Sequence, residues 1–124
     1  MIPPHSERAG EVRVVLPWPD RMLSPNARTH WSVKSRATRN ARTEAWLVVG
    51  GSVRRPGWDR AHVSMTFCPP DKRRRDLDNC ISSTKAARDG IADALGIDDS
   101  KFETTYRMGE PVKGGAVLVT VRAA

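Results

Sequence analysis

The stretch that decides the fold is AHVSMTFCPPDKRRRDLDN, residues 61–79. Its first seven residues alternate apolar and polar side chains, as a half-buried β-strand does, and Pro69-Pro70 ends the alternation. After the prolines, four consecutive cations at 72–75 lead into the carboxylates of Asp76 and Asp78. The stretch therefore predicts a strand over 61–67 that ends in a charged loop.

A helix is expected to follow this loop. Asp78 or Asn79 is placed to cap its first turn. The helix should then run from about Cys80 to Leu95, and Gly96 is expected to be its carboxy-terminal stop. The basic and acidic residues are thus predicted to lie between a strand and a helix.

The rest of the chain supplies further elements on both sides. Residues 12–16 are β-branched and predict a first strand, and a helix capped by Ser32 is expected over 32–49. Two more strands are expected near 104–108 and 116–122, and their closeness in the chain predicts an antiparallel hairpin. The predicted order is β-α-β-α-β-β, an α+β (mixed α/β layer) fold.

Length and composition limit the organisation of the chain. Its 124 residues suffice for one domain with its own core, expected over 12–124, behind a flexible amino-terminal arm over 1–11. Two cysteines are too few for a disulfide framework, and the apolar runs are too short to cross a bilayer. A cytoplasmic protein is expected, without a membrane partner or an organic cofactor.

The charge points to the class of partner. The formal net charge is +7, and the cations cluster at 72–75 and over residues 28–42, which favours a polyanion such as nucleic acid. Carboxylates beside such a run are the ligands that Mg²⁺ and Mn²⁺ prefer. A second acidic pair, Asp98-Asp99, follows the second helix and could return to Asp76 and Asp78. The pattern favours a metal-dependent nuclease.

Each of these residues also has a purely structural interpretation. Asp76 could pair with a neighbouring arginine, and Asp78 could merely cap the helix. Lys85 could form an exposed helical ion pair with Asp89, or it could hold a phosphate. Trp18 and Trp31 could both cover the core, or stack on exposed bases.

Together these motifs make the chain resemble the RusA-type Holliday junction resolvases. The resemblance spans roughly residues 12 to 122, and its most specific element is the Arg-Asp-Leu-Asp-Asn core within residues 73–79. The other matching segments are Leu16-Pro17-Trp18-Pro19, Ser24-Pro25-Asn26, Lys85, Asp89-Gly90, Asp98-Asp99 and Lys113-Gly114-Gly115.

The resemblance implies a small homodimer that binds branched DNA and cuts four-way junctions symmetrically, using Mg²⁺ or Mn²⁺, in DNA recombination and repair. It implies that Asp76 and Asp78 are catalytic metal ligands and that Asp99 is the third, although Asp98 remains an alternative. Lys72, Arg73, Arg74 and Arg75 are expected to hold the DNA backbone.

One spacing departs from the familiar family pattern. The helix lysine, Lys85, lies six residues after Asn79 instead of three, a spacing that resembles a branch of the family often found in phages and prophages. Lys85 is therefore a candidate catalytic residue, with Asp89 as the alternative. One or two metal ions per site are both compatible with the motif. The alternative function is a branched-DNA-binding module without cleavage activity.

Overall fold

The computed structural model of the protein describes residues 6–8 and 10–124. In chain order its elements are β1 (Ser6–Arg8), β2 (Glu11–Leu16), the 3₁₀ turn η1 (Arg21–Leu23), α1 (Trp31–Ser52), β3 (Ala61–Cys68), α2 (Leu77–Ser83), α3 (Lys85–Leu95), the 3₁₀ turn η2 (Asp99–Lys101), β4 (Phe102–Met108) and β5 (Ala116–Ala123). The fold is a small single domain of the mixed α+β class, as predicted.

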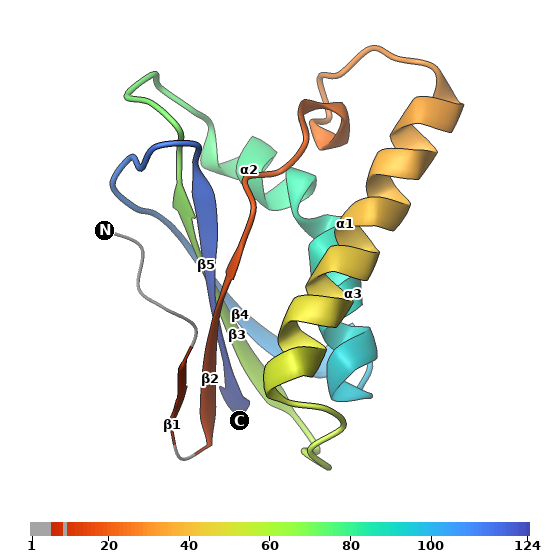
Figure 1. Cartoon of the computed structure of the whole chain (residues 1–124), viewed down its shortest axis with the longest axis vertical. Helices are drawn as coiled ribbons and strands as arrows, with labels where there is room; N and C mark the ends of the chain where they lie inside the picture. Colours follow the sequence, from red (N-terminus) through yellow and green to blue (C-terminus); the bar gives the residue numbers. More distant parts are fainter. Residues whose placement is uncertain (1–5, 9) are drawn as a thin grey trace.

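The strands form one mixed sheet in the order β1-β2-β5-β3-β4. β3 and β4 are parallel, and each of the other neighbouring pairs is antiparallel. Figure 1 shows α1 and α3 together on one face of this sheet, with α2 across one end. The second layer therefore covers a single face, and the motif that follows β3 lies at the end where α2 begins.

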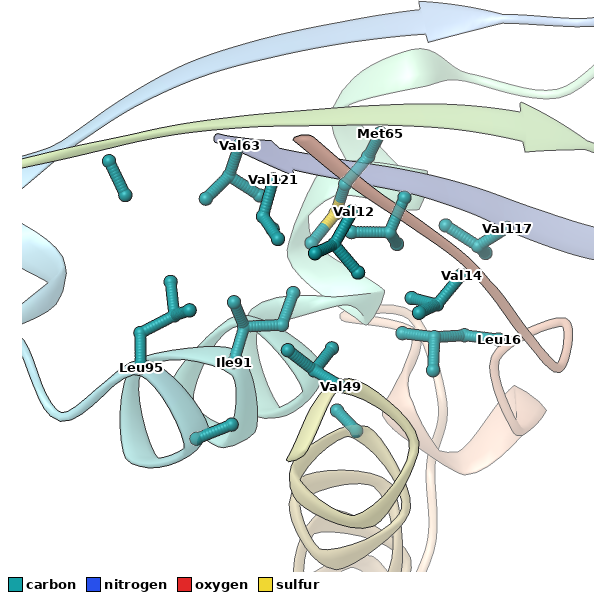
Figure 2. Packing of buried hydrophobic residues seen from close by; sticks show 14 of the residues in the cluster. Val12, Val14, Leu16, Val49, Val63, Met65, Ile91, Leu95, Val117 and Val121 are labelled. Atoms are coloured by element: carbon teal, nitrogen blue, oxygen red, sulfur yellow. The ribbon is translucent and has the colours of Figure 1, made fainter. Parts of the chain in front are cut away.

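The core lies between the sheet and these helices. The predicted alternation over residues 61–67 is confirmed, because Ala61, Val63, Met65 and Phe67 are all fully buried. Figure 2 shows side chains of the sheet meeting Val49 of α1 and Ile91 and Leu95 of α3. Burial of this apolar surface is what attaches the helices to the sheet.

The predicted hairpin of the last two strands is wrong. β5 lies between β2 and β3, whereas β4 pairs with the other side of β3 and forms an edge of the sheet. The side chains explain this arrangement. β5 buries Val117, Val119 and Val121 and suits a central position. β4 instead exposes Glu103 and Arg107, which suit an edge strand.

The predicted second helix is divided in two. α2 ends at Ser83, and the chain turns at Thr84, whose buried hydroxyl donates to the carbonyls of Cys80 (3.2 Å) and Ile81 (2.9 Å). These bonds satisfy carbonyl groups at the end of α2, where helical partners are missing. Gly96 ends α3, as predicted, and its φ is 71°.

The first helix is longer than predicted. It is capped by His30, whose Nδ1 accepts from the Ser32 amide at 3.2 Å, and it continues through both glycines to Ser52. α1 also packs closely against α3. A Cβ added to Gly90 of α3 would overlap the Arg42 carbonyl of α1, so only glycine permits this spacing.

Part of the segment expected to be a flexible arm, 1–11, belongs to the sheet. Ser6–Arg8 pair antiparallel with the start of β2, and Gly10 makes the turn with φ 72°. Residues 1–5 and 9 lie outside the described part of the chain. Among the described residues, no helix is long and apolar enough to cross a membrane.

Candidate metal and DNA interface

Asp76 and Asp78 lie at the start of α2, immediately after the basic loop. The Oδ1 atom of Asp76 accepts from the backbone amide of Asp78 at 2.9 Å, so Asp76 rather than Asp78 or Asn79 caps the helix. Both carboxylates are exposed, and in the described part of the chain neither forms a salt bridge. The alternative interpretation, in which Asp76 pairs with a neighbouring arginine, is therefore wrong. Apart from the capping contact, both carboxylate groups face solvent.

The basic loop is organised by Asp71, a carboxylate that the sequence analysis did not single out. Its Oδ1 accepts from Arg75 Nη1 at 2.7 Å and from the Arg73 backbone amide at 2.9 Å. The Arg75 hydrogen bond, followed by that amide, holds the pKa of Asp71 well below its usual range. The sequence signal that could have indicated this role is spacing, because Asp71 precedes Arg73 by two residues and Arg75 by four.

The cations of the loop consequently differ in role. Arg75 is half-buried, and its guanidinium lies 5.6 Å above the ring of Trp18. Lys72 and Arg74 are exposed, and neither forms a salt bridge among the described residues. Arg73 is also exposed, although it reaches Asp71 at 3.3 Å. The outward charge beside Asp76 therefore comes mainly from Lys72, Arg73 and Arg74.

Asp99 is the first residue of η2, between α3 and β4, and Asp98 is the N-cap of this turn. Asp98 Oδ1 accepts from the Ser100 amide at 2.8 Å, and this bond contributes most to the lowered pKa of Asp98. Asp99 Oδ2 lies 3.6 Å from Arg88 Nη1, and Arg88 Nη2 donates to the Asp99 carbonyl at 3.3 Å. Both acids thus already have structural partners within their own chain.

The structure does not bring this acidic pair beside Asp76 and Asp78. β3 and β4 are parallel and registered over seven residue pairs, so the pair of strands is about 20 Å long. Asp99 lies just before the first residue of β4, whereas Asp76 follows the carboxyl end of β3. Figure 1 shows α2 and the end of α3 near opposite ends of the sheet. Accordingly, no group of three metal-ligating side chains occurs among the described residues of one chain.

Two exposed carboxylates are nevertheless enough protein ligands for a metal such as Mg²⁺. Mg²⁺ is commonly held by one or two carboxylates, with water and substrate phosphate completing its shell. Asp76 and Asp78 offer hard oxygen atoms next to cations that suit a phosphate backbone. The pair therefore fits Mg²⁺ or Mn²⁺ bound together with nucleic acid.

Lys85 is exposed at the first position of α3, past the turn at Thr84. The ion pair considered between Lys85 and Asp89 is not formed in the described structure. Both residues instead line a pocket with Lys34 and Thr38 of α1. Lys85 is free to meet an anion there.

The two tryptophans in question have different environments. Trp18 is half-buried and packs on Gly115, where an added Cβ would lie 2.8 Å from the Trp18 Cβ. This supports the lid interpretation for Trp18. Trp31 is 74% exposed at the start of α1, so for this residue the lid interpretation is wrong. Its neighbours Arg28 and Lys34 form no salt bridge among the described residues, which leaves a positive, aromatic surface.

Comparison with known proteins establishes a family but no activity. No protein-family model matches the chain. It is 39% identical over 117 residues to a protein of Xylella fastidiosa (strain Temecula1 / ATCC 700964) described as an uncharacterized protein. The match covers 87% of this chain and 74% of the relative, and the chain belongs to the same family as that protein.

Proposed function

We propose that the protein is a metal-dependent, structure-selective DNA endonuclease that cleaves four-way junctions, as the RusA-type resolvases do, in DNA recombination and repair. The observation that carries the proposal is the exposed pair Asp76 and Asp78, which has no salt-bridge partner in the described chain and closely follows the exposed Lys72 and Arg74 in sequence. A cation run next to unpaired carboxylates suits a phosphate and a divalent metal together.

In this proposal Asp76 and Asp78 hold the metal, which when bound supplies Lewis-acid stabilisation of charge at a phosphodiester. The Asp78 amide fixes one oxygen of Asp76 at 2.9 Å and so orients the other for binding. Lys72, Arg73 and Arg74 hold the backbone without reading sequence. Arg75 acts indirectly, because it is bonded to Asp71 and supports the shape of the loop.

The third carboxylate, Asp99, cannot join this pair within one chain, because it lies at the other end of the β3–β4 pair. A homodimer solves this difficulty if Asp99 of one protomer approaches Asp76 and Asp78 of its partner. Two such sites related by a two-fold axis would also place two cuts symmetrically on a junction.

The separation of Asp99 equally supports a second function. A module that binds branched DNA without cleaving it would need the basic loop and the positive start of α1, but no complete acidic cluster. In that case Asp99 would serve only to pair with Arg88, and Asp98 to cap η2. The metal dependence of strand scission distinguishes the two functions.

The test replaces the two carboxylates while monitoring binding and cleavage separately. Asp76→Asn or Asp78→Asn keeps the side-chain size but removes a charged metal ligand. Junction affinity, measured in Ca²⁺ or EDTA, should stay equal or rise, because a negative charge facing phosphate is removed. Cleavage in Mg²⁺ should fall by orders of magnitude. Folded variants that bind and cut at the wild-type rate would refute the proposed site.

A further inference from the structure

Trp31 is an aromatic side chain that neither the core nor the proposed metal site uses. It is the first residue of α1 and is 74% exposed, more than any other exposed large hydrophobic side chain in the described part of the chain. A single exposed ring is common on protein surfaces, so its surroundings decide whether it binds a ligand. Those surroundings are ordered, positively charged and close to α2.

The neighbouring residues hold the Trp31 ring in place. The ring centroids of His30 and Trp31 lie 5.8 Å apart, with an angle of 33° between the ring planes. His30 is itself fixed at the start of the helix, because its Nδ1 accepts from the Ser32 amide at 3.2 Å. Trp31 therefore loses little conformational freedom when a ligand stacks on it, which favours binding.

The charge around Trp31 suits a polyanion. Residues 21–43 contain six Arg and Lys side chains and no carboxylate. Arg28 and Arg36 are exposed on either side of Trp31 in the sequence, and neither forms a salt bridge among the described residues. Proteins that bind unpaired nucleotides stack the bases on aromatic rings while neighbouring cations hold the backbone. A nucleic-acid base is therefore the ligand that this surface fits.

Trp31 also lies toward the end of the molecule that carries the acidic pair. Figure 1 shows the start of α1 and α2 toward the same end, and η1 contacts both helices. Lys34, about one helical turn after Trp31, lines a pocket with Lys85, which follows α2. DNA held at Asp76 and Asp78 can thus extend past these two lysines to Trp31.

We infer that Trp31 stacks on the open face of an unstacked base at the branch point of DNA, and that this contact favours branched over linear DNA. Each internal base of a linear duplex already lies between two neighbours, whereas a branch point interrupts the stack and leaves a base face free for an aromatic ring. The inference rests on the proposed function for the nature of the partner, DNA, but it needs neither metal nor cleavage.

The test compares binding to a synthetic four-way junction with binding to linear duplex of the same arm sequence, both in EDTA. Trp31→Ala should weaken junction binding about 5- to 100-fold, the range that loss of one base–aromatic stack produces. The affinity for linear duplex should stay unchanged. The slope of log affinity against log salt should also stay unchanged, because no cation is removed. Trp31→Phe keeps an aromatic face and should retain most of the junction affinity.

A second exposed tryptophan of α1 supplies the matched control. Trp46 is 46% exposed, but it lines a hollow together with four aspartates, at positions 89, 93, 98 and 99. Negative charge at this place disfavours contact with DNA. Trp46→Ala should therefore bind the junction as the wild type does.

Fluorescence separates stacking from an indirect effect of the substitution. Junction DNA should quench part of the tryptophan emission of the wild type and of Trp46→Ala, whereas Trp31→Phe should bind with that quenching lost. Junction binding by Trp31→Ala as tight as that of the wild type, or an equal loss on junction and duplex, would overturn the inference. Cleavage by the wild type in Mg²⁺ is measured separately, so the proposed function is judged by its own assay.

Discussion

A mixture of two inactive variants should recover cleavage if each site takes acids from both protomers. Asp76→Asn and Asp99→Asn are each expected to inactivate both sites of a homodimer. In a mixed dimer, both substitutions fall in the same composite site, and the other site is entirely wild type. The prediction follows from the distance of about 20 Å that the β3–β4 pair places between the two acids of one chain.

The expected recovery can be calculated from random pairing. In an equal mixture about half of the dimers are mixed, and each carries one intact site of two, so about one quarter of the wild-type sites should be active. The assay is cleavage of a labelled four-way junction after co-refolding or co-expression. Because a mixed dimer has one working site, the product should be nicked rather than symmetrically cut.

A matched mixture supplies the control. Asp76→Asn with Asp78→Asn should stay inactive, because both acids come from the same protomer and each site of the mixed dimer then carries one substitution. Affinity tags on the two chains show that mixed dimers have formed. If the Asp76→Asn and Asp99→Asn mixture cuts no faster than either parent while mixed dimers are present, the composite site is wrong.

Three further predictions concern the loop and the helix packing. Lys72→Ala with Arg74→Ala should make the slope of log affinity against log salt shallower by about 0.9 for each phosphate that is no longer neutralised, in anisotropy titrations; an unchanged slope would mean that neither side chain touches the DNA backbone. Gly90→Ala should lower the free energy of unfolding in urea by about 1–3 kcal/mol, because its Cβ overlaps α1; equal stability would contradict the close approach. The pKa of the Asp71 carboxyl is lowered, mainly by the hydrogen bond from Arg75, so the ionised group stabilises the fold at pH values above its unfolded pKa of about 3.9. This stabilisation is lost as the pH falls below that value. Asp71→Asn should therefore weaken the dependence of the free energy of unfolding on acid pH, and an unchanged pH profile would contradict this role.

Local patterns predicted those parts of the fold that depend on neighbouring residues alone. The alternation over 61–67 predicted a half-buried strand because side chains in a strand point to opposite faces in turn. Glycine at position 96 predicted a helix end because glycine adopts positive φ angles that strain other residues. The structure gives Gly96 a φ of 71°. The loop after Pro69-Pro70 was predicted for the same local reason, since prolines disfavour continuation of the strand.

Tertiary contacts decided the features that the patterns did not reveal. No glycine or proline marks the turn at Thr84, where side-chain hydrogen bonds and burial separate α2 from α3. The prediction that β4 pairs with β5 was wrong because it relied on their closeness in the chain and not on their amino-acid composition. The apolar strand β5 takes the central position, and the polar strand β4 takes the edge.

The candidate site was predictable only in part for the same reason. Asp76 and Asp78 were predicted to lie in the loop between a strand and a helix that begins near Cys80; the helix begins earlier, so Asp76 is its N-cap and Asp78 lies in its first turn. The position of Asp99 depends on the direction of β4. Because β4 runs parallel to β3, the chain must return to the start of β3 before β4 begins. Asp99 therefore comes to the opposite end of the sheet from Asp76, which no local pattern could indicate.

The central claim is tested most directly by incubating the purified wild-type protein with a synthetic four-way junction, with Mg²⁺ and with EDTA. The account predicts binding in both conditions and paired, symmetric cuts only in Mg²⁺, with linear duplex of the same sequence left intact. Tight junction binding without strand scission in Mg²⁺ or Mn²⁺ would contradict it and would identify the protein as a branched-DNA-binding module.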